Sequence, residues 1–232
     1  LQTAQGITPI SCATPNVAGT LNDGNRPSLS AAQLRSVISG SGDPADLFGV
    51  PAGLVKYNRR VNGSGTQATS NIFFLGAPCT AGASVNLAPL PHDGVGVFAH
   101  SGSGNVRDAI NGETAAYALG VLSMETAQLA NLGYVKVGGV NPNRANVING
   151  SYGLFGEETF QYNPGVVSAA QQRIIELYAT HSGSVDTLSG LAAAAGLAAL
   201  PTAELSSNPA LNAAFVMKGT RLGNNCAPQQ LY

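Results

Sequence analysis

The chain has 232 residues, of which 44% are hydrophobic and 10% are charged. It is therefore long enough for one large domain or two small ones with a sizeable core. The net charge of −1 argues against a nucleic-acid-binding protein, because such proteins carry a basic excess. The longest apolar run, residues 190–200, is shorter than the roughly 20 residues that span a bilayer. We therefore expect a soluble, globular protein.

The three cysteines point to an oxidising compartment. Cys12, Cys79 and Cys226 lie far apart in Pro-, Gly- or Asn-rich stretches, and no Cys-x-x-Cys spacing suggests a metal site. Loop disulfides suit a periplasmic or extracellular (secreted) protein. The chain opens at Leu1 without a signal peptide, as expected of a mature or trimmed product. The odd count leaves open a free thiol, an intermolecular bond, or a partner cysteine elsewhere in the protein.

Hydrophobic periodicity and Gly/Pro signals predict strands and helices in alternation. In chain order we expect a loop at 6–28, a helix at 31–38, a strand at 53–57, a helix at 67–75, a strand at 94–99, a helix at 106–110, and strands at 117–122 and 134–137. The second half predicts a helix at 144–148, a strand at 158–162, and helices at 166–180, 185–200 and 209–217. This order predicts an α/β fold with additional C-terminal helices. We expect an α/β lobe at 1–125, and returning strands with the C-terminal helices at 126–232.

Residues 57–70 carry the clearest chemical signal. Gly63-Ser64-Gly65-Thr66 stands between a predicted strand and a predicted helix, where unpaired amides and the helix dipole favour an anion. Ser64 and Thr66 would add hydroxyl donors, and Arg60 would add a charged planar fork. An ordinary Ser-capped helix after a Gly turn explains the same residues, so the motif alone leaves both interpretations open.

A second turn of the same kind is Ser101-Gly102-Ser103-Gly104-Asn105, again ahead of a helical pattern. A structural helix cap is the simpler explanation, and Ser101, Gly102 and Ser103 are weaker candidates for ligand contact. Ser103 lacks the Gly-x-Ser-x-Gly frame of a hydrolase nucleophile. No other pairing of a nucleophile with a base emerges, so we expect no enzyme, and no catalytic, cofactor or metal site.

Three blocks follow one another between residues 30 and 165. The first joins Leu34-Arg35-Ser36-Val37-Ile38-Ser39-Gly40 to Arg60-Val61-Asn62-Gly63-Ser64-Gly65-Thr66, the second runs from residue 101 to 123, and the third includes Asn146-Val147-Ile148-Asn149-Gly150-Ser151-Tyr152. In this order the blocks resemble the solute-binding proteins of bacterial phosphate transporters, which have the type II periplasmic-binding-protein fold. The resemblance implies a periplasmic-binding-protein-like (type II) α/β lobe.

The resemblance also implies the roles of the residues in the first block. The family holds phosphate in an Arg-x-Asp-Gly-Ser-Gly-Thr loop, which this chain matches except at Asn62. Ser64, Gly65 and Thr66 would donate amides and hydroxyls to a tetrahedral oxyanion, Gly63 would complete the loop, and Arg60 would pair with the charge. Asn62 replaces an acidic residue that orients the arginine in the family, which leaves the pocket more positive or lets Arg60 turn elsewhere.

The implied function is a non-catalytic solute-binding protein for phosphate or a similar small oxyanion, with a membrane ABC transporter as partner. Only a loop is expected before residue 30, so the N-terminal lobe segment of the family would be absent. Either the chain is then a processed or partial product, or a second polypeptide or self-assembly completes the binding cleft, or the fold serves as a scaffold. The alternative is a structural or adhesive surface assembly protein that reuses the fold, which would explain the low charge and the abundance of glycine.

Overall fold

The computed structural model describes residues 2–10, 28–39, 55–79, 95–113, 117–127, 129, 132–191, 196–201 and 205–231. The chain forms two compact units. The sheet unit comprises Gln5–Pro142, and the C-terminal unit comprises Leu1–Ala4 together with Asn143–Tyr232. The first strand, β1 (Gln2–Ile10), contributes residues to both units.

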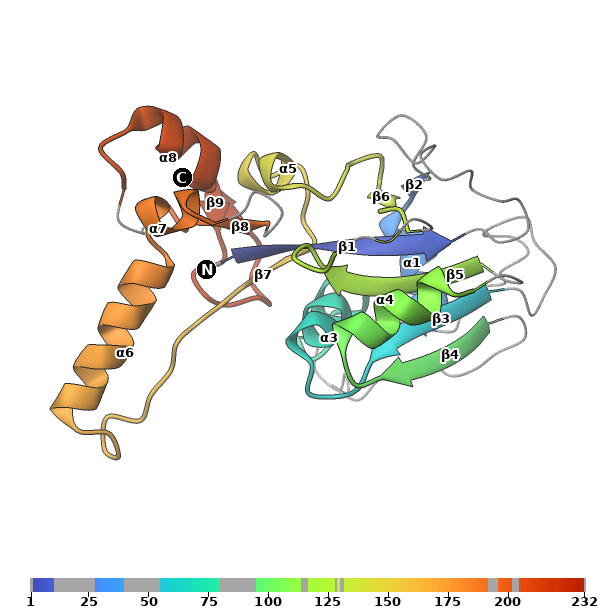
Figure 1. The fold of residues 1–232 in the computed structure, drawn as a ribbon, viewed down its shortest axis with the longest axis horizontal. Coiled ribbons are helices and arrows are strands. Elements are labelled where there is room, and N and C mark those ends of the chain that lie inside the picture. The colour runs from blue at the N-terminus through green and yellow to red at the C-terminus, as the bar shows by residue number, and fades with distance from the viewer. Residues whose placement is uncertain are drawn as a thin grey trace. The chain divides into compact units, whose positions relative to one another are not determined.

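Parallel strands form the centre of the sheet unit (Figure 1). β3 (Val55–Arg60) pairs in parallel with β4 (Val95–His100) on one side and with β5 (Tyr117–Ser123) on the other, and β5 pairs with β1 in antiparallel fashion. The carboxyl ends of parallel strands lie at the same edge of a sheet. The segments that follow β3 and β4 therefore begin next to each other.

Helices of the sheet unit follow these strands. α1 (Ala31–Ser39) precedes β3, α3 (Gly65–Ser70) follows it and continues as the π-helical segment η1 (Asn71–Leu75), and α4 (Ser103–Asn111) follows β4. A short parallel pair is formed by β2 (Ser28–Leu29) and β6 (Lys136–Val137).

The packing of α4 against β5 forms a core of the sheet unit. Val106 and Ile110 of α4 are fully buried and contact Ala118 and Leu122 of β5. Gly120 makes this close approach possible, because a Cβ there would lie 2.7 Å from the Ile110 side chain. Dense packing of this kind fixes the start of α4 relative to the sheet edge.

The C-terminal unit is built mainly of short elements. They are α5 (Arg144–Ile148), β7 (Phe155–Glu157), α6 (Ala169–Ser182), α7 (Val185–Ser189), β8 (Leu197–Ala198), α8 (Pro209–Phe215), β9 (Gly219–Thr220) and β10 (Gln230–Leu231). Val185, Leu188 and Ala199 form its core with side chains of α8. The first residues of β1 pair in antiparallel fashion with β7 and β8.

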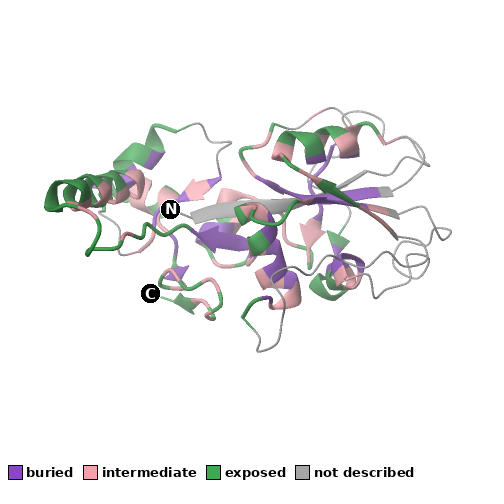
Figure 2. Cartoon of the chain, turned by 90° about the horizontal axis from the view of Figure 1, so that it is seen from below, coloured by how far each residue is buried: buried purple, intermediate pink, exposed green. Residues whose placement is uncertain are grey.

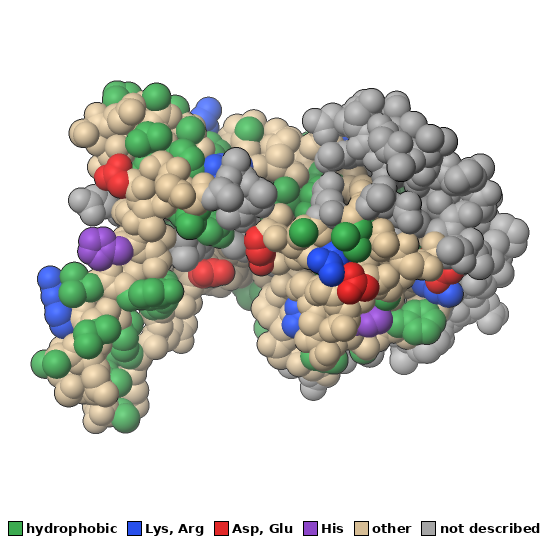
Figure 3. Space-filling model, viewed as in Figure 1, with side chains coloured by type: hydrophobic (Ala, Val, Ile, Leu, Met, Phe, Trp, Pro, Cys, Tyr) green, Lys and Arg blue, Asp and Glu red, His purple; other side chains and the backbone are tan. Residues whose placement is uncertain are grey.

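None of the residues of helix α6 is buried (Figure 2). A capping box of Ser168 and Gln171 begins the helix, which satisfies amides that would otherwise lack partners. Hydrophobic side chains lie on its surface (Figure 3), among them Ile174 at 66% and Tyr178 at 63% exposure. The ring of Tyr178 meets the ring of Phe160 edge to face, with 5.4 Å between centroids.

A buried carboxylate organises the end of the C-terminal unit. Glu157 is 4% exposed and accepts hydrogen bonds from the hydroxyl of Thr220 at 2.9 Å, from the amide of Gly223 at 2.6 Å, and from the amide of Arg221. The guanidinium of Arg221 lies 4.1 Å from the centre of the Phe155 ring and donates to the carbonyl of Phe155. Burial lowers the pKa of Arg221, whereas the charge of Glu157 raises it.

Most of the predicted helices and strands occur in the described part of the structure, with bounds shifted by a few residues. Three predictions depart from it. The loop predicted at 6–28 is wrong for residues 6–10, which belong to β1; pairing with β5 supplies a strand that a Thr- and Pro-containing composition did not suggest. Residues 11–27 lie outside the described part. The strand predicted at 158–162 is also wrong, because β7 ends at Glu157, where the side chain of Asn225 bonds both its amide and its carbonyl.

The third departure is the helix predicted at 185–200. The structure has the short helix α7, which ends at Ser189, and then the strand β8. Gly196 has a φ of +65°, which lies in the left-handed region. A right-handed helix cannot continue through such a residue. The alanine-rich composition favoured a helix, but the backbone conformation at this glycine excludes a continuous one.

Candidate oxyanion site

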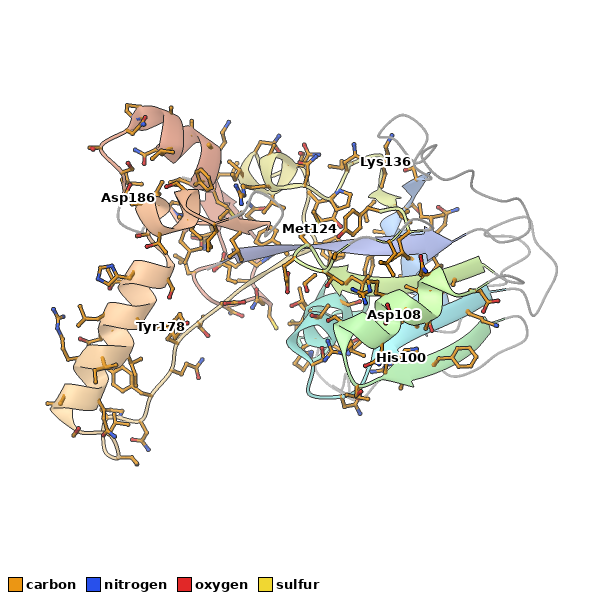
Figure 4. All side chains as sticks on the ribbon, in the orientation of Figure 1. His100, Asp108, Met124, Lys136, Tyr178 and Asp186 are labelled. Atoms are coloured by element: carbon orange, nitrogen blue, oxygen red, sulfur yellow. The ribbon has the colours of Figure 1, made fainter. Side chains whose placement is uncertain are left out.

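The two Gly/Ser turns of the sequence lie at one edge of the sheet. In the parallel pair β3–β4, Arg60 is the partner of His100. His100 is the last residue of β4 and is labelled in Figure 4. The amide of Val61 then donates to the carbonyl of His100 at 2.9 Å. The loops that lead into α3 and α4 therefore start from paired positions on neighbouring strands.

The first turn has the strand–turn–helix form that the sequence predicts. Gly63 has a φ of +90°, a conformation that favours glycine. Ser64 is the N-cap of α3, and its hydroxyl accepts from the amide of Gln67 at 3.5 Å. Within the described part of the chain, the backbone amides of Gly65 and Thr66 donate no hydrogen bond. Two backbone donors and the hydroxyl of Thr66 thus remain for a ligand.

Arg60 connects the first turn to the second. Its Nη1 donates to the hydroxyl of Ser103 at 2.6 Å, and its Nη2 donates to the carbonyl of Ser101 at 2.9 Å. Its Nε is shielded from solvent and has no hydrogen-bond partner within the described ranges. The contacts of this guanidinium are therefore neutral groups, and no described carboxylate neutralises it.

Asn62 does not orient Arg60. Its side-chain oxygen accepts from Nη2 of the neighbouring Arg59 at 3.1 Å, and Arg59 itself is only 4% exposed. The guanidinium of Arg60 instead turns toward the start of α4, where it contacts Ser101 and Ser103.

The second turn supplies an uncapped helix start. Gly102 is the N-cap of α4 and offers no side-chain bond to the helix amides. A cation such as Arg60 beside a helix N-terminus is electrostatically unfavourable unless an anion joins it, because the dipole places partial positive charge there. The position of the Arg60 guanidinium at the start of α4 therefore favours binding of a negatively charged group.

Gln67 is a residue of the site that the sequence analysis did not single out. It is 3% exposed; its Oε1 accepts from the amide of Arg60 at 3.1 Å, and its Nε2 donates to Asn71 at 2.9 Å. Nε2 also lies 3.4 Å from the hydroxyl of Tyr57, whose pKa is raised by burial. The spacing Ser64-x-x-Gln67 is that of a capping box, which is the signal that could have drawn attention to it.

His100 should make the stability of the sheet unit depend on pH. Desolvation lowers the pKa of His100 below its usual 6.5, and its Nε2 lies 2.9 Å from the side-chain oxygen of Asn58. A folded pKa below the unfolded one gives stability that is present above about pH 6.5 and lost as the pH falls through the lower folded value. In urea denaturation, we expect the wild type to lose more stability than His100→Gln when the pH falls from about 7 to about 5. Identical losses in both proteins would contradict this role.

Three further features of the described residues concern metal-binding groups, membrane-spanning helices and disulfides. No group of three His, Cys, Asp or Glu side chains that could hold a metal occurs among them. None of the helices that the structure describes has the length and apolar character needed to cross a bilayer. Cys79 and Cys226 are both disulfide-bonded, and Cys12 lies outside the described part.

No family model matches this sequence, and no curated protein matches it. Solved structures do match the fold. An ABC-type phosphate transport receptor from Vibrio cholerae has a TM-score of 0.56 at 15% identity, over 78% of this chain and 65% of the receptor. A putative phosphate ABC transporter substrate-binding protein with bound phosphate from Clostridium perfringens has a TM-score of 0.51 at 19% identity, over 82% of this chain and 69% of that protein. PstS from Borrelia burgdorferi also has a TM-score of 0.51, at 11% identity over 82% of this chain and 68% of that protein.

This chain thus spans 65% of the length of the Vibrio cholerae receptor. At such identities the likeness concerns the fold and not the ligand. It confirms the fold that the three sequence blocks predicted. The chain has the mixed α/β fold of the substrate-binding proteins of phosphate ABC transporters.

Proposed function

We propose that the chain is a non-catalytic solute-binding protein for phosphate or a similar small oxyanion. The observation that carries this proposal is the guanidinium of Arg60, which lies at the start of α4 and contacts only neutral groups among the described residues. A tetrahedral oxyanion there would accept from the charged fork and would offset the positive ends of the helices.

The remaining ligand groups come from the first turn. The backbone amides of Gly65 and Thr66 donate no hydrogen bond within the described structure, and Ser64 and Thr66 add hydroxyl groups. Gly63 and Asn62 shape the turn through the φ of +90° and the contact with Arg59. Ser101 and Ser103 would take part by holding Arg60, and Gly102 would leave the first amides of α4 without a side-chain cap.

The same proposal includes a membrane ABC transporter as partner and a location outside the cytoplasm. It is supported by the fold shared with ABC-type phosphate transport proteins and by the disulfide-bonded Cys79 and Cys226, since disulfides persist in oxidising compartments. A second polypeptide that supplies a further lobe, or self-assembly, stays a prediction. The alternative of a structural or adhesive assembly protein is not favoured, because the matching structures are transport receptors and binding proteins.

Phosphate binding should raise the melting temperature of the protein. A ligand that binds only the folded state stabilises it by about 2.7 kcal/mol at 100 times its Kd. We expect the melting temperature to rise with phosphate concentration and to remain constant with chloride at the same ionic strength. Sulfate and arsenate in parallel would identify the class of oxyanion. If none of the three oxyanions shifts the transition more than chloride does, the proposed function is wrong.

A further inference from the structure

The side chain of Arg60 is held from the start of α4 and not from its own loop. Both of its side-chain hydrogen bonds go to the second turn, at 2.6 Å to the hydroxyl of Ser103 and at 2.9 Å to the carbonyl of Ser101. Two bonds to two nitrogens of one planar group fix the direction of that plane. The start of α4 therefore determines where the guanidinium points.

The first turn offers no substitute for these bonds. Asn62 lies two residues after Arg60, but its side-chain oxygen accepts from Arg59. Gln67 bonds the backbone amide of Arg60 and leaves its side chain untouched. Among the described residues, the hydroxyl of Ser103 is thus the one side-chain group that bonds the guanidinium of Arg60.

We propose that Ser103 is the positioning residue for Arg60 in the oxyanion site, an inference that rests on the proposed function. An arginine side chain loses many rotamers when a ligand fixes it, so an arginine that is already held loses less entropy on binding. A hydroxyl achieves this without cancelling the positive charge, whereas a carboxylate would compete with the ligand for it. Ser103 thus orients the charge and leaves it available to the oxyanion.

This role separates the effects of three substitutions. Ser103→Ala removes the hydroxyl, so phosphate should bind about fivefold to tenfold more weakly, the effect of one hydrogen bond. Ser103→Thr keeps a hydroxyl at the same position and should restore affinity to within about twofold of the wild type. Ser189→Ala removes an exposed hydroxyl in the C-terminal unit and should leave affinity unchanged. Titration calorimetry of phosphate binding measures all of these values.

A double-mutant cycle distinguishes positioning from direct contact with the ligand. If Ser103 acts through Arg60, Ser103→Ala should weaken phosphate binding in the wild type but cause no further loss in the Arg60→Ala protein. NMR titration of backbone amides can follow the weak binding expected there. The same loss in both backgrounds, or a Ser103→Ala protein that binds like Ser189→Ala, would overturn the inference while the proposed function stands. If the wild type binds no oxyanion at all, the proposed function fails first and the inference fails with it.

Discussion

Arg60→Ala should abolish the rise in melting temperature with phosphate over the concentrations that saturate the wild type. The substitution removes the only charged group that we assign to the site and leaves the oxyanion with neutral donors alone. Hydrogen bonds to charged groups contribute about 1.5–3 kcal/mol each. Loss of two such bonds weakens binding about 100-fold or more. Phosphate titration followed by calorimetry and by thermal unfolding tests this expectation.

The chain offers a matched control for charge. Arg107 lies on α4 and is paired with Asp108, so Arg107→Ala changes the net charge equally without removing a group of the site. We expect it to reduce phosphate affinity by no more than about twofold, a long-range effect screened by salt. Arg60→Lys should fall between the two, since lysine keeps the charge but loses the planar fork. Equal losses for Arg60→Ala and Arg107→Ala would show that general charge, and not this site, attracts the anion.

Glu157→Ala should lower the free energy of unfolding of the C-terminal unit by about 3–5 kcal/mol, the range for breaking a buried charged network. The substitution removes the acceptor for the hydroxyl of Thr220 and for the amides of Arg221 and Gly223. Thr220 is 1% exposed, so its hydroxyl would lose its partner without regaining water. Urea denaturation followed by circular dichroism measures the change.

Two neighbouring substitutions define the cause of this loss. Glu158 is exposed, so Glu158→Ala should change stability by less than about 0.5 kcal/mol. Glu157→Gln keeps one side-chain oxygen as an acceptor, but its NH2 group would face one of the backbone amides that donate to the carboxylate in the wild type. It should therefore cost less than alanine and more than the exposed control. A Glu157→Ala protein as stable as Glu158→Ala would rule out the network as a determinant of stability.

The parts of the site formed by consecutive residues were predictable from the sequence. The contact that depends on how two strands pair was not. The turn from Gly63 to Thr66 could be predicted because a strand, a glycine turn and a capped helix follow one another directly. The contact between Arg60 and Ser103 joins residues 43 positions apart. It exists because β3 and β4 pair in parallel with Arg60 opposite His100, and no spacing in the sequence states this pairing.

The partner of Asn62 was also not predictable from the sequence. Sequence reasoning treated Asn62 as a neighbour of Arg60, the arginine of the family motif. In the structure it bonds Arg59, whose side chain is buried. Successive residues of a strand point to opposite faces, so Arg59 and Arg60 enter different surroundings, and only the tertiary structure determines which of them reaches the asparagine.

The use of a backbone carbonyl at Ser101 has a consequence for how this site could change in evolution. The oxygen that bonds Arg60 there is present in every amino acid, so the residue type at position 101 is free to vary while the contact persists. Position 103 acts through its side chain, so this contact requires serine or another hydroxyl residue. An insertion or deletion between β4 and α4 would shift both groups at once, so we expect the length of this turn to matter more for the contact than the residue type at position 101.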